Sequence, residues 1–234
     1  MAADILCIIP ARGGSKRIPK KNIALLKGKP LISYTIEAAV TSGLFASVIV
    51  STEDDEIASV SESSGAVVYK RDPKLASDTA TVVETCLDVL EVYEGSGKTC
   101  SHICVLLPTS PFRTSEDIQS AMLKLMQSNG NAVMAVTSYE IPPFWALSER
   151  EGFLSPHFGK QYMIRSQDLP SVSVDNGAIY IVETEVFKKE KLFYTSKLVG
   201  YHMSRDRSID IDESLDLHFA EFLMSKNSMS EVEK

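Results

Sequence analysis

Seven short apolar runs recur along the 234-residue chain, and segments with helical spacing separate most of them. The runs cover residues 5–9, 47–51, 66–69, 103–107, 132–137, 178–182 and 198–203. The run at 103–107 is apolar throughout, which is typical of a strand that helices cover on both faces. Strands that alternate with helices of about 10–15 residues predict an α/β fold with a doubly wound, mostly parallel sheet.

Helices are expected over residues 31–40, 52–65, 82–90, 114–130 and 212–226, where apolar residues recur at intervals of three and four. Asp78 or Thr79 is expected to cap the third helix. Thr114, followed three residues later by Asp117, resembles a capping box for the fourth helix. The last helix is predicted to turn four apolar residues inward: Leu215, Phe219, Phe222 and Leu223.

Residues 138–174 interrupt this alternation. They are rich in proline, aromatic and polar residues, show no clear helix, and are too many for an ordinary connector. We therefore predict an inserted lid or dimerisation arm. The catalytic α/β domain is expected to comprise residues 1–137 and 175–226, and residues 227–234 are expected to form a disordered tail.

Charge and hydropathy exclude several classes of protein. The net charge of −7 argues against a general nucleic-acid binder. No run approaches the roughly 18 apolar residues of a membrane span, and the first residues lack the basic region of a signal peptide. We expect a cytoplasmic protein with neither a nucleic-acid nor a membrane partner. Four cysteines are expected to be buried and reduced: Cys7, Cys86, Cys100 and Cys104.

The loop after the first run is strongly basic. It contains the adjacent Gly13 and Gly14, and glycine lets backbone N–H groups approach a ligand closely. Cationic side chains would add charge-assisted hydrogen bonds to phosphate. The loop suits a polyphosphate, although a solvated basic turn is the alternative. It matches neither the Walker A motif nor G-x-G-x-x-G. Its five cations are Arg12, Lys16, Arg17, Lys20 and Lys21.

A pair of acids lies almost two hundred residues later. Strand-like alternation places Asp210 and Asp212 on one side of the chain. Such a pair would supply oxygen ligands for Mg²⁺ beside substrate phosphates. The alternative is that these acids cap the last helix. Because ligands of doubly wound sheets bind beyond the carboxyl ends of the strands, the basic loop and the acids together fit metal-assisted nucleotidyl transfer.

Six blocks of sequence carry a family resemblance. They are residues 9–16 with 21–22, 50–52, 75–80, 108–113, 165–170 with 176–180, and 208–212. In this order they resemble the CMP-sialic acid synthetases, or acylneuraminate cytidylyltransferases, from residue 8 to about 221. A wider group of sugar-acid cytidylyltransferases shares the first block, and the later blocks are more specific.

The resemblance implies a Rossmann-like nucleotidyltransferase that joins CTP to a sialic-type, nine-carbon nonulosonic acid, giving the CMP-sugar and pyrophosphate with Mg²⁺. It implies a homodimer in which the 138–174 arm reaches the partner's active site. Either a metal-bound hydroxide or Asp212 would accept the proton of the attacking anomeric hydroxyl.

The resemblance also implies roles for individual residues. Catalysis would depend on Lys21, with Arg12 and Asp212, and the metal would be held by Asp210 and Asp212. Phosphates would contact Arg12, Ser15, Lys16 and Lys21. The rest of the nucleotide would contact Ala11, Gly13, Asn22, Arg71 and Ser77. The sugar acid would contact Arg165, Gln167 and Tyr180.

One position departs from the family pattern. Many sialic acid enzymes have glutamine where this chain has Leu107. Residues 165–169 are similar to the pseudaminic acid enzymes, whereas residues 176–180 are closer to the sialic and legionaminic enzymes. Pseudaminic, legionaminic or Kdo acid are therefore alternative acceptors. A nucleotide-binding regulator without turnover is a further alternative, but a pure binder would not need Lys21 together with a carboxylate pair.

Overall fold

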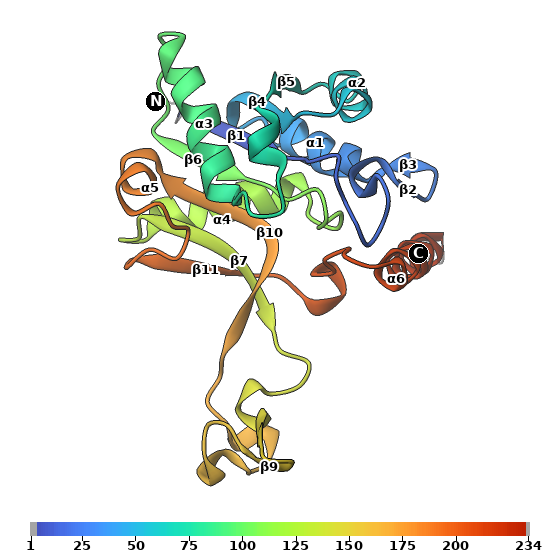
Figure 1. Cartoon of the computed structure of the whole chain (residues 1–234), viewed down its shortest axis with the longest axis vertical. Coiled ribbons are helices and arrows are strands. Elements are labelled where there is room, and N and C mark those ends of the chain that lie inside the picture. The colour runs from blue at the N-terminus through green and yellow to red at the C-terminus, as the bar shows by residue number, and fades with distance from the viewer. Residues whose placement is uncertain (1–3, 233–234) are drawn as a thin grey trace.

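The computed structural model describes residues 4–232 as a layered α/β body with a long projecting arm (Figure 1). A seven-stranded sheet has the order β11-β7-β10-β6-β1-β4-β5. β10 is antiparallel to both neighbours, and the other pairs are parallel, which confirms the mostly parallel sheet. All seven expected strands are present: β1 Ile5–Pro10, β4 Phe45–Thr52, β5 Val67–Lys70, β6 His102–Val105, β7 Ala132–Ser138, β10 Ser173–Glu183 and β11 Leu198–His202.

Helices cover both faces of the sheet. Alternate side chains of β1 enter different cores, since Cys7 packs on the side of α1, α2 and α4, and Leu6 packs on the side of α3 and α5. This arrangement confirms the doubly wound prediction. The four cysteines are buried and free, as expected. The helices are α1 Leu31–Ser42, α2 Asp55–Ser63, α3 Val82–Gly95, α4 Ser115–Gln127, α5 Thr184–Glu190 and α6 Ser214–Val232; α5 was not expected.

One of the two predicted helix caps is present in the structure, and the other is not. Thr114 and Asp117 form the predicted capping box of α4. The cap of α3 is Thr81, which forms a capping box with Glu84, so the prediction of Asp78 or Thr79 was wrong. Two reciprocal hydrogen bonds to backbone amides favour Thr81. Asp78 is left in the loop before the helix, where it has another role.

The orientation of α6 differs from the prediction. Its Leu215, Phe219 and Phe222 are exposed, and Leu223 alone of the four expected residues is buried. The helix carries a second apolar stripe, which packs on the basic loop and on the hairpin of β2 (Leu25–Leu26) and β3 (Lys29–Pro30). The stripe comprises Leu217, Ala220 and Met224. The spacing of apolar residues alone did not show which of the two stripes is buried. The packing of the second stripe brings residue 212 next to the basic loop.

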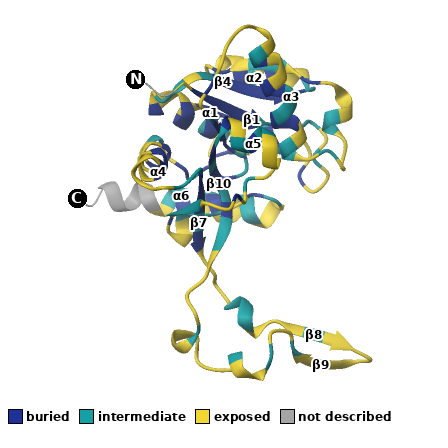
Figure 2. Cartoon of the chain, turned by 90° about the vertical axis from the view of Figure 1, so that its left-hand side faces the viewer, coloured by how far each residue is buried: buried dark blue, intermediate teal, exposed yellow. Residues whose placement is uncertain are grey.

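The predicted arm is a ribbon that leaves the sheet through β7 and returns through β10 (Figures 1 and 2). Its far end carries an exposed hairpin of β8 (Leu147–Arg150) and β9 (Phe153–Pro156). Three short 3₁₀ helices complete it: η3 Pro143–Trp145, η4 Lys160–Tyr162 and η5 Ser166–Asp168.

At the other boundary, α6 extends beyond residue 226 to Val232, and residues 233 and 234 of the predicted tail lie outside the described part. Among residues 4–232, no helix has both the length and the apolar character needed to cross a bilayer.

Candidate active site

Three neighbouring strands end at the same edge of the sheet. β4 pairs in parallel with β1 on one side and with β5 on the other, so the loops after all three strands meet. A cavity of about 510 Å³ opens there. The lining includes Leu107 and eight of the residues predicted for the site: Arg12, Ser15, Lys16, Lys21, Asn22, Arg71, Ser77 and Asp212.

Two cations of the basic loop share one carboxylate. Arg12 Nη1 lies 3.2 Å from Asp78 Oδ1, and Lys16 Nζ lies 2.5 Å from Asp78 Oδ2. The hydrogen bond from Lys16 is the main cause of a lowered pKa at Asp78. Asp78 lines the cavity but was considered only as a helix cap. Its carboxylate occupies the donors expected to hold phosphate, so the loop presents a preassembled anion site.

Lys21 pairs with an acid from the far end of the chain. Its Nζ donates to Asp212 Oδ1 at 2.8 Å, and Arg17 Nη2 donates to Asp212 Oδ2 at the same distance. The hydrogen bond from Lys21 is the largest cause of a lowered pKa at Asp212. Only 15% of the Lys21 side chain is exposed. Arg17 also lines the cavity, although no role was predicted for it. Its position among the five cations of the basic loop was the feature of the sequence that could have indicated one.

Asp210 and Asp212 flank a buried residue, as the alternation predicted. Ile211 is fully buried, and its N–H donates to the Thr109 carbonyl at 2.8 Å. Asp210 lies beside the cavity rather than in its lining. Asp210 is exposed, but partial desolvation by the surrounding protein raises its pKa, and the negative charge of Asp212 adds to the effect. The two carboxylates are therefore close enough to influence each other.

These acids do not cap α6. The backbone N–H groups of Asp212 and Glu213 donate to Asp216 Oδ2 at 2.9 and 2.7 Å. Asp216 thus provides the capping contacts, and the Asp212 side chain turns to Lys21 and Arg17.

A magnesium ion suits this pair of acids. Within residues 4–232, no group of three or more His, Cys, Asp and Glu side chains could hold an ion without help. Mg²⁺ in phosphate-transfer sites commonly takes one or two carboxylates and completes its shell with water and substrate phosphates. Asp210 and Asp212 provide that number of hard oxygen ligands next to the phosphate-binding cations, so the residues present fit the ion.

The backbone of the basic loop is held by contacts behind the cavity. Asn22 Nδ2 donates to the Arg12 carbonyl at 2.8 Å, and the Ala11 N–H donates to the Ser51 carbonyl at 2.9 Å. At Gly13, a Cβ atom would lie 2.7 Å from Asp54 Oδ2. A larger residue at this position would displace the Asp54 side chain, because the N-terminal cap of α2 packs directly against the loop.

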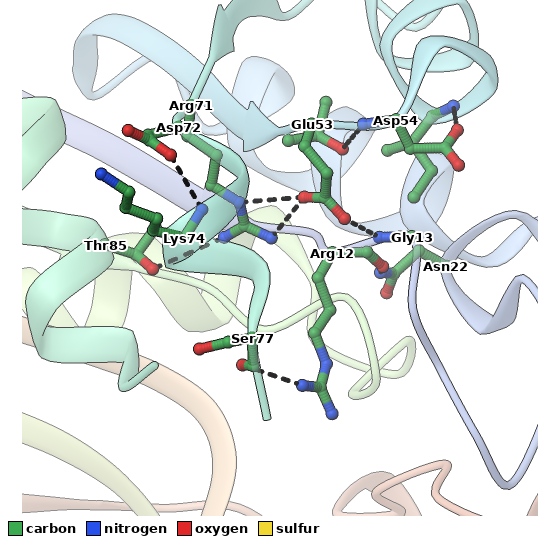
Figure 3. Close-up of polar contacts among 12 residues, drawn as sticks. Arg12, Gly13, Asn22, Glu53, Asp54, Arg71, Asp72, Lys74, Ser77 and Thr85 are labelled. Carbon is green, nitrogen blue, oxygen red and sulfur yellow. Dashed lines mark hydrogen bonds and ion pairs between the residues drawn. The ribbon is translucent and has the colours of Figure 1, made fainter. Parts of the chain in front are cut away.

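Glu53 links this loop to Arg71 (Figure 3). Its Oε1 accepts the Gly13 N–H at 2.7 Å, and its Oε2 accepts Arg71 Nε at 3.0 Å and Nη2 at 2.9 Å. Arg71 is almost fully buried yet lines the cavity. In the sequence, Glu53 could be recognised only as an acidic residue at the end of a predicted strand. Its partners depend on the order of the strands, which the sequence pattern did not specify.

The residues expected at the acceptor are not assembled within one chain. Arg165 and Gln167 lie on the arm, away from the cavity lining, and Arg165 Nε donates to Asp168 Oδ2 at 2.9 Å. Tyr180 lies on β10, where its hydroxyl donates to Asp175 Oδ2 at 2.9 Å. Burial, followed by the charge of Asp175, raises the pKa of Tyr180. The cavity lining therefore includes most of the predicted nucleotide contacts and none of the predicted acceptor contacts.

Comparison with known proteins identifies the family. A family model described as cytidylyltransferase matches residues 6–209. The chain belongs to the cytidylyltransferases. A pseudaminic acid cytidylyltransferase from Campylobacter jejuni is 35% identical over 229 residues, which cover 96% of this chain and 98% of the relative. An N-acylneuraminate cytidylyltransferase from Streptococcus agalactiae is 36% identical over 211 residues, covering 88% of this chain and 50% of that longer relative.

The solved structures agree on the fold. A CMP:2-keto-3-deoxy-manno-octonic acid synthetase complexed with CTP superposes with a TM-score of 0.70 at 16% identity, covering 96% of this chain and all of that one. The predictions of a Rossmann-like nucleotidyltransferase enzyme and of membership in the CMP-sialic acid synthetase group are confirmed.

Proposed function

We propose that this cytidylyltransferase activates a nine-carbon nonulosonic acid with CTP, releasing the CMP-sugar and pyrophosphate. One observation carries the proposal. At the edge of the cavity, Lys21 from the basic loop pairs with Asp212 from the far end of the chain at 2.8 Å. A cation for phosphate and a carboxylate for a metal thus meet in one place, although 191 residues separate them.

The geometry supports a direct transfer of the nucleotidyl group. The anomeric hydroxyl oxygen of the acid bonds to the α-phosphorus of CTP, and the bond from that phosphorus to the bridging oxygen of the β-phosphate breaks. Pyrophosphate leaves, and the hydroxyl proton passes to Asp212 or to water held in the site. Arg12, Lys16 and Lys21 hold the phosphates and stabilise the charge that develops in the transition state.

Asp210 and Asp212 would hold Mg²⁺. When bound, the ion would offset negative charge on the α-phosphate and on the leaving pyrophosphate. Triphosphate oxygens would replace Asp78 as partners of Arg12 and Lys16, because a polyphosphate carries more charge than one carboxylate.

The base would contact the part of the cavity that Arg71 and Ser77 line. Asn22 also lines the cavity and supports the loop through the Arg12 carbonyl. The guanidinium of Arg71 offers donors that match the acceptor edge of cytosine.

The acceptor belongs to the class on which the relatives act. Leu107 lines the cavity with an aliphatic side chain that offers no hydrogen bond. This favours an acid other than N-acetylneuraminate. One relative that is covered almost completely is named for pseudaminic acid, and a second, also 35% identical, is named a CMP-N,N'-diacetyllegionaminic acid synthase. Pseudaminic acid is therefore the first acceptor to test, with legionaminic, N-acetylneuraminic and Kdo acids as the comparison panel.

The arm would complete the site of a second protomer. Arg165 and Gln167 lie outside the cavity lining of their own chain, and a homodimer would bring them to the partner's cavity. The arm's exposed apolar residues, including Ile141, Phe153 and Leu154, would be covered in such a dimer.

Pyrophosphate release with CTP and Mg²⁺ across the acid panel tests the reaction. Release with at least one nonulosonic acid is expected, and no release with any of them would refute the proposal.

Mixed dimers test the arm. Lys21→Ala and Arg165→Ala chains are assayed at a sugar-acid concentration below the wild-type KM, where each alone should have little activity. They should recover about a quarter of wild-type activity when unfolded and refolded together, because half of the dimers then contain one intact site. No recovery, with dimers present, would place both residues in the same chain's site.

A further inference from the structure

One carboxylate behind the cavity ties two binding loops together. Glu53 follows β4 directly, and its two oxygens divide their contacts between the loop after β1 and the loop after β5. Figure 3 shows its side chain between Gly13 and Arg71. Glu53 is not among the residues that line the cavity. It therefore acts through its neighbours rather than on a ligand.

A simple counter-charge would not explain this arrangement. The side chain of Arg71 is only 3% exposed, and a buried guanidinium needs a paired anion. That need is met by Oε2 alone, which accepts both Nε and Nη2. The other oxygen accepts the backbone N–H of Gly13 at 2.7 Å. Glu53 thus fixes the start of the phosphate-binding loop at the same time as it fixes the arginine.

The contacts also decide which donors of Arg71 remain for a ligand. A guanidinium has five N–H groups, and Glu53 takes two of them, from Nε and Nη2. Nη1 lies 3.5 Å from Thr85 Oγ1, a long contact. Across residues 4–232, no further protein acceptor bonds this guanidinium. The remaining donors on Nη1 and Nη2 are adjacent, so they can address two acceptors side by side.

Cytosine presents such a pair, since its O2 and N3 are both acceptors. Uracil instead carries a hydrogen on N3, which would face one of the donors of Arg71. A buried donor left without an acceptor is costly, and discrimination of this kind depends on a donor that cannot rotate away. Fixing the guanidinium is therefore as important for base selection as its presence.

We propose that Glu53 is a positioning residue that couples base recognition to phosphate binding, by holding Arg71 and the Gly13 amide as one unit. The identity of the base rests on the proposed function. Two links define the unit, so replacing Glu53 by glutamine, which offers one acceptor oxygen and an NH₂ group, breaks one link and removes the charge.

Calorimetric titration of CTP and UTP, without any acceptor acid, tests this coupling. Glu53→Gln should weaken CTP binding and reduce the ratio of CTP to UTP affinity by about tenfold. Glu53→Asp keeps the charge but is too short for both partners, so it should show the same direction of change while the protein remains folded. The matched control is Asp55→Asn, which removes an exposed acid paired with Lys70 outside the cavity. It should leave both affinities unchanged.

A double-mutant comparison separates positioning from general stability. If Glu53 acts through Arg71, the base preference of Glu53→Gln with Arg71→Lys should equal that of Arg71→Lys alone. An unchanged ratio of CTP to UTP affinity in both folded Glu53 variants would overturn the inference. Additive losses of base preference in the double variant would also overturn it. If the wild type binds CTP in preference to UTP but releases no pyrophosphate with any acid, the proposed function fails and the inference on Glu53 stands.

Discussion

The proposed nucleotide side and the proposed acceptor side of the site are built in different ways. The nucleotide side is enclosed by three neighbouring strand ends and by ion pairs that join distant segments. The acceptor side depends on Arg165 and Gln167, which lie on a ribbon that projects into solvent (Figure 2). One half of the site is thus fixed by the core of a single protomer, whereas the other half is expected to require a partner.

Shortening the arm should separate the two sides most strongly. Ser138 and Ser173 are directly paired in β7 and β10, so an Asn-Gly turn can replace residues 139–172 without changing the register. We expect CTP binding to remain and turnover to fall below detection, as measured by calorimetry and pyrophosphate release. Retained turnover would show that the arm is dispensable, and loss of CTP binding in a folded variant would show that the two sides are not independent.

Removing Lys21 should damage the nucleotide side. Lys21→Ala removes the cation that faces the phosphates, and we expect turnover to fall by about 10²–10³-fold at saturating substrate. The neighbouring Lys20→Ala is the matched control, because Lys20 pairs with Glu56 and lies outside the cavity lining. Equal losses in the two variants would mean that the loop contributes only general positive charge.

Removing Arg165 should affect the other substrate. A charged hydrogen bond to a carboxylate is worth about 1.5–3 kcal/mol, so Arg165→Ala should raise the KM of the sugar acid by about 10–100-fold. The KM of CTP should not change. Arg150→Ala, also on the arm but in the distant hairpin, is the control. A raised KM for CTP in Arg165→Ala would contradict the division between the two sides.

The smallest effect is expected at Asp78, which competes with phosphate for Arg12 and Lys16. Asp78→Asn should lower the KM of CTP by about two- to threefold, since exposed ion pairs are weak. The lowered pKa of Asp78 keeps it ionised below the usual aspartate range. The difference from wild type should therefore persist from pH 8 to about pH 5, and should disappear only under more acid conditions. Asp55→Asn is the control, and an unchanged KM for CTP would show that Asp78 does not compete.

The sequence predicted the fold and the sheet edge at which the basic loop gathers, because both depend on local signals. Continuous apolar runs marked the strands, and the cations after residue 10 marked the edge at which ligands bind. The Asp210–Asp212 alternation was equally visible, and the burial of Ile211 confirms it.

Other features depend on contacts that no local pattern reveals. The role of Glu53 depends on β4 lying between β1 and β5. The face of α6 could not be chosen because Phe219 and Leu217 lie on two competing apolar stripes, and only packing on the basic loop separates them. The acceptor contacts were assigned by family resemblance, and in the proposed function a second chain completes them.

The pairing of Ser138 with Ser173 has a consequence for how such enzymes diversify. The arm enters and leaves the sheet through two adjacent strands, so its length and sequence can change between these points while the register of β7 and β10 is kept. On the proposed function, mutations that alter the choice of acid fall largely in this insertion, and mutations that alter the choice of nucleotide fall in the core. A lineage can then acquire a new sugar specificity while selection on the CTP site continues unchanged.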